Sequence, residues 1–543
     1  MPADMMPIPD WVDSESEPIR GLDLLGLRLP AQAIGNILLS GITTISPTTR
    51  YLSIRAWLIR TFELSGLPAT WKAIEDFAAS IESAVVLGNL LVNPNMPGLV
   101  GPDRAHPLVE SPADPLPLGR LVVQLAFNTY AGPSEALGLS STLASGLPAL
   151  TSERGKPLAD EFEKAVQGTR FRAILAGGTM PASASRDVLQ EFGERVRVDV
   201  IPPGESTWIL NAIMPANPGN VAGANERNRI ATYVTLLELA DSLKREPQDP
   251  DFFQLVARPD PQVSLAVQSI LDDWACYAVR DMLAVTHEAA MNAVMDELAA
   301  RHGESAYVDA TTLIAEMLAR TDDINSPLQE LGLLATNESY ENLTFQELER
   351  RVENAARPTP GCSCVQRWCG DLTEPSVRRL VAPGTVAVFG LLPVAWLLAR
   401  RRVDTTQAKG IEMLQSLSSQ GWSRIGMQQT MLPLLQQWHR ENRTLPAVIF
   451  QLVRRTVEQH LRIAWSRLVT DPTKDVALLI ADGEQWFFRK KFRHGRPASR
   501  LRETVGWLRQ LGLVDQQGIT TSGRDVLCRG HKILVDKAPG SSL

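Results

Sequence analysis

Two carboxylates seven residues apart are the first candidates for chemistry in this sequence. Asp281 and Glu288 lie in the largely apolar stretch 267–303, and helical geometry places residues at this spacing on one face. Carboxylates on an apolar face can act as general acid and base or hold a metal ion. The commoner arrangement, which we favour, bonds each carboxylate to a nearby arginine or helix N-terminus. His287 would be turned about 100° away from Glu288 on a helix, so the pair is not an HExxH zinc motif.

A cluster of three cysteines is the second candidate, as a metal site. Cys362, Cys364 and Cys369 follow a C-x-C-x4-C spacing, whereas tetrahedral zinc takes four ligands, usually from paired knuckles. The fourth ligand would have to come from elsewhere, from Asp371, Cys276 or Cys528. We therefore predict reduced, structural cysteines and no metal or other cofactor. The odd number of cysteines, and first residues without a signal-peptide pattern, indicate a cytoplasmic protein.

The basic end of the chain is the third candidate, for binding a polyanion. Residues 441–543 contain 18 Lys and Arg against 10 Asp and Glu, a net charge of +8. Residues 1–440 contain 36 against 51, a net charge of −15. This asymmetry indicates a nucleic-acid partner for the basic end, and the alternative is a solvated tail without a partner. The candidate binding residues are Arg489, Lys490, Lys491, Arg493, Arg496, Arg500, Arg502 and Arg509.

The elements that would position these cations follow from the local pattern. Apolar residues recur at helical spacing from Leu501 to Leu513 and leave the arginines for other faces. Residues 514–521 predict a strand, a turn and a second strand, and a helix capped by Thr521 or Ser522 follows. Helix, hairpin and helix in this order, with the stretch LGLV…ITTSG, resemble the winged-helix family.

The resemblance to winged helices implies a mode of DNA binding. In that family the helix before the wing often enters the major groove, which would place Arg500, Arg502 and Arg509 on or near the groove-facing helix. The five cations from Arg489 to Arg496 would contact phosphates. Because many winged helices bind proteins instead, a protein-docking role stays open.

The N-terminal stretch resembles uncharacterised bacterial proteins found near phage-defence or DNA-modification genes. It matches a GxDxLG…LLxGIT…RYxSxxxW pattern, and the similarity extends through TVEQHLRIAWSRL and the winged helix. The matching residues are Gly21, Asp23, Leu25, Gly26, Leu38, Leu39, Gly41, Ile42, Thr43, Arg50, Tyr51, Ser53 and Trp57. The resemblance carries no assigned activity.

Most of the chain predicts helix. Helical periodicity covers 50–63, 267–303 and 446–469. Clear strand signals are few: residues 195–202 alternate in the strand period, and two apolar runs flank Asp482–Gly483 as in a hairpin. The uncharged stretch 381–399 is close to membrane-spanning length, but its prolines and glycines favour a buried helix pair in a soluble core.

We therefore predict a mainly α, multi-domain protein, with a helical body and a C-terminal α+β winged-helix module. The expected parts are an N-terminal helical domain (1–93), a Pro-rich linker or loop (94–119), a mixed α/β middle region (120–243), a helical region (244–356), a Cys-containing loop and helical region (357–470) and the winged-helix module (471–543).

The leading functional hypothesis is a non-enzymatic, nucleic-acid-binding subunit of a multi-protein bacterial system that acts on DNA, such as anti-phage defence. Its expected partners are duplex DNA and proteins of the same system, with no membrane. One alternative is a metal-dependent nuclease or hydrolase that uses Asp281 and Glu288. Another is a structural adaptor whose winged helix docks protein. The sequence contains no P-loop, no G-x-S-x-G and no Rossmann glycine fingerprint.

Overall fold

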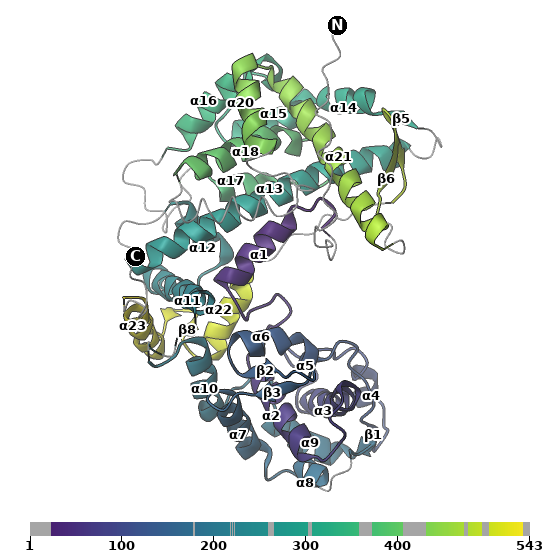
Figure 1. Ribbon diagram of the computed structural model, residues 1–543, viewed down its shortest axis with the longest axis vertical. Helices are drawn as coiled ribbons and strands as arrows, with labels where there is room; N and C mark the ends of the chain where they lie inside the picture. The colour runs from purple at the N-terminus through teal and green to yellow at the C-terminus, as the bar shows by residue number, and fades with distance from the viewer. Residues whose placement is uncertain are drawn as a thin grey trace. The chain divides into compact units, whose positions relative to one another are not determined.

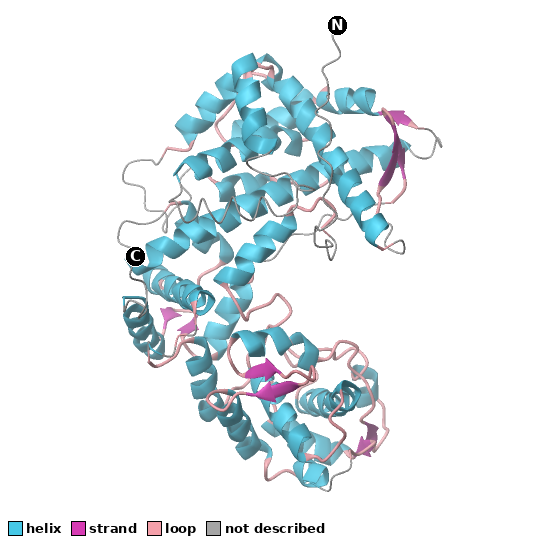
Figure 2. Cartoon of the chain, viewed as in Figure 1, coloured by secondary structure: helices cyan, strands magenta, loops and turns pink. Residues whose placement is uncertain are grey.

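The protein is mainly helical, as predicted, with a few short antiparallel strands (Figure 2). The computed structural model describes residues 23–176, 180–217, 219, 221, 223–258, 265–301, 307–357, 372–405, 430–471, 476–490 and 499–535. The chain divides into two compact units. The first unit takes Met1–Gly35, Pro250–Val263 and Gln268–Pro497, and the second takes Asn36–Asp249, Ser264–Val267 and Ala498–Leu543.

The first unit is built of helices and one three-stranded sheet (Figure 1). Its elements, some of which begin or end just across the boundary, are α1 (Arg28–Leu38), α12 (Asp249–Ala257), α13 (Leu265–Arg301), β5 (Val308–Asp309), α14 (Ala310–Leu318), α15 (Thr321–Glu330), η3 (Tyr340–Asn342), α16 (Phe345–Ala355), α17 (Glu374–Leu380), α18 (Val388–Thr405), α20 (Leu432–Glu441), α21 (Leu445–Thr470), β6 (Leu479–Asp482) and β7 (Gln485–Phe488).

The stretch 381–399 forms a turn followed by one buried helix, α18, so the prediction of a helix pair was wrong. Pro383 and Gly384 occupy the turn before α18, while Pro393 is accommodated inside the helix. Gly390 lies where α15 approaches, since a Cβ there would meet Ile324 O at 2.8 Å. Within the described residues, no helix combines the length and the apolarity needed to cross a bilayer.

Two further helices and the hairpin of the first unit confirm their predictions. α13 and α21 cover the predicted stretches 267–303 and 446–469 within a few residues, although Gly303 lies outside the described residues. The sheet has the order β5–β7–β6 and is antiparallel throughout. Asp482 pairs with Gln485, so β6 and β7 join through a two-residue turn in which Gly483 adopts a φ of 58°.

The second unit is also mainly helical (Figure 1). Its elements are α2 (Arg50–Leu64), α3 (Trp71–Val92), α4 (His106–Glu110), β1 (Leu116–Pro117), α5 (Ala126–Thr129), α6 (Ala131–Ala136), β2 (Ser140–Thr142), β3 (Pro148–Leu150), α7 (Gly155–Val166), α8 (Arg170–Ala176), β4 (Ser183–Ala184), α9 (Arg186–Arg195), α10 (Pro203–Ile213), α11 (Ala224–Leu243), α22 (Leu501–Gln510), β8 (Val514–Asp515), β9 (Gly518–Ile519) and α23 (Thr521–Val535).

The strand predicted over 195–202 is absent, because this segment is a loop after α9. Its backbone is satisfied by side chains from distant elements and not by a neighbouring strand. The Asn89 side chain donates to Val196 O (3.2 Å) and accepts from Val198 N (3.0 Å). The Arg50 guanidinium donates to the carbonyls of Arg195 and Arg197. The alternating apolar residues Val196 and Val198 are buried, although the segment pairs with no strand.

The predicted module 471–543 is divided between the two units. The β6–β7 hairpin belongs to the first unit, and α22, β8, β9 and α23 belong to the second. In the second unit, α23 and β9 pack against α11. The Pro-rich stretch 94–119 is mostly irregular and contains α4 and β1, of which β1 pairs with β4.

Candidate nucleic-acid interface

The helix α22 is amphipathic, as its sequence predicted. Leu501, Val505 and Leu508 are buried, and so is Trp507. The Trp507 indole N–H donates to Ser46 O at 2.8 Å, which fixes the buried face of α22 against the turn before α2. The opposite face is therefore the one that a ligand can reach.

The exposed face of α22 carries two arginines with a glycine between them. Arg502, Gly506 and Arg509 are spaced i, i+4 and i+7, and both arginines are exposed. A Cβ at Gly506 would meet no atom within 4 Å, so the space above it is open. Arg509 Nε donates to Glu246 Oε2 at 2.7 Å, and the arginine side chain is 59% exposed.

Arg500 lies at the start of this helix in a different environment. It adopts a left-handed backbone with a φ of 65°, and its Nη1 donates to Ile42 O at 3.0 Å. Arg500 therefore ties α22 to the Ile42 turn, within the second unit. Its predicted contact with nucleic acid stays a prediction.

The structure describes two of the other five predicted cations, and neither lies on this helix. Arg489 and Lys490 are exposed in the first unit, directly after β7, where both backbone N–H groups donate to Leu478 O at 2.8 and 3.1 Å. Lys491, Arg493 and Arg496 lie outside the described residues. Among the five candidates that the structure describes, Arg502 and Arg509 lie on α22 and Arg500 directly precedes it.

The hairpin after α22 is short. Val514 pairs with Ile519 and Asp515 with Gly518, so each strand has two residues. Gly518 adopts a φ of 101°, and a Cβ there would meet Ala240 O of α11 at 2.5 Å. The next helix, α23, is capped by Thr520, whose Oγ1 accepts from Gly523 N at 3.0 Å. The predicted caps, Thr521 and Ser522, were wrong, although the order helix, hairpin, helix is present.

The two candidate catalytic carboxylates are each bonded to an arginine, as we favoured. Asp281 Oδ2 lies 2.8 Å from Arg378 Nε, and Glu288 forms a bidentate pair with Arg28. Both carboxylate side chains are almost fully buried. Asp23 is also close, and its buried carboxyl accepts from the backbone of Leu27 and Arg28 at the start of α1.

The environment of these carboxylates argues for a structural role. Burial, with the nearby Glu288 charge, raises the pKa of the Asp23 carboxyl. The buried carboxylates of Glu288 and Asp281 balance the cations of Arg28 and Arg378, which are 16% and 29% exposed. In the part of the chain that the structure describes, no group of three or more His, Cys, Asp and Glu side chains is placed to hold a metal ion.

Cys362, Cys364 and Cys369 lie outside the described residues. Cys276 is buried on α13, and burial raises the pKa of its thiol to about 12. Cys528 is exposed on α23. Because these two belong to different units, we do not assign them to one site.

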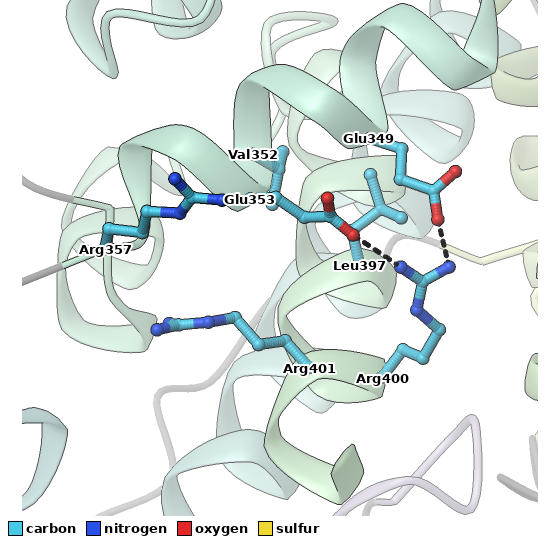
Figure 3. Close-up of a pocket in the computed structure, with 7 residues that line it drawn as sticks. All are labelled: Glu349, Val352, Glu353, Arg357, Leu397, Arg400 and Arg401. Carbon is cyan, nitrogen blue, oxygen red and sulfur yellow. Dashed lines mark hydrogen bonds and ion pairs between the residues drawn. The ribbon is translucent and has the colours of Figure 1, made fainter. Parts of the chain in front are cut away.

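A small pocket in the first unit gathers several charges between α16 and α18 (Figure 3). It has a volume of about 230 Å³ and is lined by Arg357, Arg400 and Arg401 together with Glu349 and Glu353. Arg400 bonds to both glutamates, as the dashed lines in Figure 3 show. Only one positive charge is in excess, which is too little to define an anion site.

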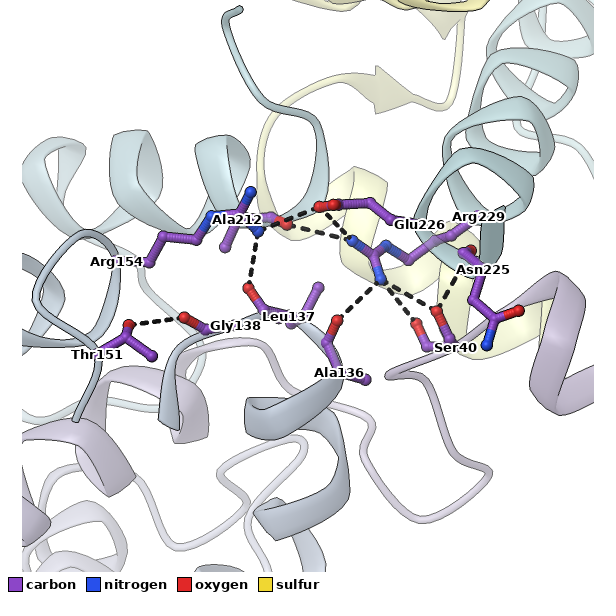
Figure 4. Close-up of polar contacts among 10 residues, drawn as sticks. All are labelled: Ser40, Ala136, Leu137, Gly138, Thr151, Arg154, Ala212, Asn225, Glu226 and Arg229. Carbon is purple, nitrogen blue, oxygen red and sulfur yellow. Dashed lines mark hydrogen bonds and ion pairs between the residues drawn. The ribbon is translucent and has the colours of Figure 1, made fainter. Parts of the chain in front are cut away.

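A larger depression in the second unit is lined by Ser40, Arg154 and Glu226. These residues belong to a polar network around the buried Arg229 (Figure 4). The Arg229 side chain is fully buried and donates to Ser40 O (3.2 Å), Ala212 O (3.3 Å) and Glu226 Oε1 (3.1 Å). Glu226 also accepts from Arg154, at 3.1 Å. One carboxylate thus serves two arginines, and the network anchors the Ser40 turn to α11.

Comparisons with protein-family models, with curated proteins and with solved structures gave no match for this chain. Two of the predicted binding residues, Arg502 and Arg509, are exposed on the same face of α22.

Proposed function

We propose that this chain is a cytoplasmic, non-enzymatic subunit of a multi-protein bacterial system that acts on DNA, and that it binds duplex DNA through α22. The carrying observation is the Arg502–Gly506–Arg509 stripe on the exposed face of that helix. The net charge of +8 over residues 441–543, in an otherwise acidic chain, supports the same ligand.

The spacing of the stripe suits a phosphate backbone. Seven residues of helix separate the two arginines by about 10 Å along the axis. A guanidinium presents a planar fork of donors that matches phosphate oxygens. Gly506 places no side chain between the two arginines, so the backbone of a DNA strand can approach the helix closely.

Arg509 already forms an ion pair with Glu246, which a phosphate would have to replace. Its ion pair with Glu246 is exposed to solvent, and exposed pairs contribute about 0–1 kcal/mol. A phosphate can therefore replace Glu246 at little cost. The ion pairs of the buried Asp281 and Glu288 carboxylates support a structural role for these groups over the hydrolase alternative.

Charge reversal on α22 tests the proposal. We expect the double variant Arg502→Glu/Arg509→Glu to bind labelled duplex DNA at least about tenfold more weakly than the parent chain. Each phosphate contact contributes about −0.9 to the slope of log affinity against log salt, so the loss of two contacts makes that slope shallower by about 1.8. Fluorescence anisotropy over a salt series measures both quantities.

The matched control is Arg350→Glu/Arg462→Glu, which makes the same change in net charge at two exposed arginines of the first unit. We expect this control to bind nearly as the parent does. Equal affinity of the α22 variant and the parent would overturn the proposal and favour the protein-docking alternative. An equal loss in both variants would show that overall charge, not α22, controls binding.

A further inference from the structure

The small sheet of the first unit carries a row of three apolar side chains on its more exposed face. Ile480 on β6 pairs with Phe487 on β7, and the pairing of Val308 with Trp486 places Tyr307 on the other side of Phe487. Antiparallel neighbours of one row share a face. The row therefore runs Tyr307, Phe487, Ile480 across the three strands.

The two faces of this sheet differ in burial. Trp486 points to the packed face and is 4% exposed. On the opposite face Tyr307 is 51% exposed, Ile480 is 43% exposed and Phe487 is half-buried. The rings of Tyr307 and Phe487 lie with centroids 5.4 Å apart and planes tilted by 44°. An exposed tyrosine is thus held in place by the aromatic ring beside it.

Charge is distributed unevenly along this sheet. Arg489 and Lys490 are exposed directly after β7, next to the apolar row. The opposite end, at the β6–β7 turn, carries Asp482 and also Glu484, whose carboxylate bonds to Arg454 at 2.7 Å. A polyanion is therefore favoured at the end of the sheet where β7 finishes and disfavoured at the turn.

From this arrangement we infer that the exposed face of the β5–β7–β6 sheet binds single-stranded nucleic acid, with a base stacked on Tyr307 and phosphates near Arg489 and Lys490. Unpaired bases stack on aromatic side chains of exposed surfaces, and adjacent cations follow the backbone. A duplex hides its base faces, so it gains nothing from Tyr307. The inference rests on the proposed function for its ligand class, but it uses a different surface.

The test compares the full-length parent chain with Tyr307→Ala, using a fluorescein-labelled twelve-nucleotide oligo(dT) and a labelled duplex. We expect Tyr307→Ala to bind oligo(dT) about tenfold more weakly, since each stacked base contributes substantially to affinity. Duplex binding should be unchanged. Tyr307→Trp keeps a stacking surface and should bind oligo(dT) at least as tightly as the parent.

The control is Trp465→Ala, which removes another exposed aromatic of the first unit, 68% exposed on α21. This variant should bind oligo(dT) as the parent does. Unchanged oligo(dT) affinity in Tyr307→Ala, or failure of the parent to bind oligo(dT), overturns the inference. If duplex binding still depends on Arg502 and Arg509 in that case, the proposed function stands without it. If oligo(dT) depends on Tyr307 but duplex does not bind, the sheet is the nucleic-acid surface and the α22 proposal fails.

Discussion

The Arg50→Met variant loses about 3–5 kcal/mol of the free energy of unfolding of the second unit. Arg50 is almost fully buried, and its Nη2 lies 3.1 Å from Glu205 Oε1. The same guanidinium donates to the carbonyls of Arg195 and Arg197. Removing it leaves the buried Glu205 carboxylate without its counter-charge, which is costly, and takes a donor from two part-buried carbonyls. Urea unfolding followed by circular dichroism measures the loss.

Two comparisons separate this cause from loss of packing. The double variant Arg50→Met/Glu205→Leu should recover part of the stability, because no lone charge remains buried. Arg60→Met removes an arginine from the same helix, where the pair with Asp160 is exposed, and should cost about 1 kcal/mol or less. A loss in Arg50→Met as small as that of Arg60→Met would contradict the role assigned to the buried pair.

Regular elements could be predicted wherever the pattern was local. The periodicity of residues 50–63, 267–303 and 446–469 matches α2, α13 and α21, because each helix is long and largely buried. The hairpin at Asp482 followed from a turn dipeptide between apolar runs. The helix α18 was predicted as a helix pair because its interior proline and glycine are residues that usually break helices. In the structure the helix continues through both, and Gly390 permits close contact with α15.

The loop 195–202 could not be predicted because its partners are remote. The Arg50 guanidinium reaches it from about 145 residues away in the chain, and Asn89 from about 107. Local alternation cannot distinguish a strand from a loop whose backbone is satisfied by such side chains.

The N-terminal sequence pattern has a structural explanation that only the fold reveals. Asp23 O accepts from Arg467 (2.6 Å), and Leu25 O accepts from Gln459 (3.0 Å). His460, in the same helix α21, contacts Leu24 O. Residues 23–25 of the GLDLLG stretch and the TVEQHLRIAWSRL stretch, which belong to one resemblance in the sequence, therefore contact each other inside the first unit.

The candidate site was only half visible in the sequence. Composition identified the basic end, but not that Arg489 and Arg502 belong to different units. The row of Tyr307 and Phe487 was missed, because the residues are 180 positions apart and meet only through strand pairing. Part of the row could have been predicted from the β7 sequence. Successive side chains of a strand point to opposite faces of the sheet, so Phe487 lies on the face opposite to Trp486.

The first unit should lose stability in acid through a buried, neutral histidine. The Trp396 indole N–H donates to His287 Nε2 at 2.8 Å, and since an indole can only donate, the ring proton lies on Nδ1. Nδ1 then donates to Thr456 Oγ1, also at 2.8 Å. Both ring nitrogens are thus used by the neutral form, and burial lowers the pKa of His287 to about 3.

The sign of the pH dependence follows from this lowered pKa. In the unfolded chain the imidazole has its ordinary pKa of about 6.5, so below that pH the unfolded state binds a proton that the folded state does not. Stability is therefore complete above about pH 6.5 and falls by about 1.4 kcal/mol per pH unit towards pH 3. Between pH 7 and pH 4 the loss from His287 is about 3 kcal/mol.

The variant His287→Gln removes the titrating group while its amide can still accept from Trp396 and donate to Thr456. We expect its free energy of unfolding to fall by about 3 kcal/mol less than that of the parent between pH 7 and pH 4. Urea unfolding at both pH values measures the difference, and hydrogen exchange in α13 and α18 assigns it to the first unit. Trp396→Phe is the control, because it removes the indole donor but leaves the imidazole buried. It should lower stability at both pH values and keep the pH dependence of the parent. An unchanged pH dependence in His287→Gln would show that this histidine is not the source of the acid sensitivity.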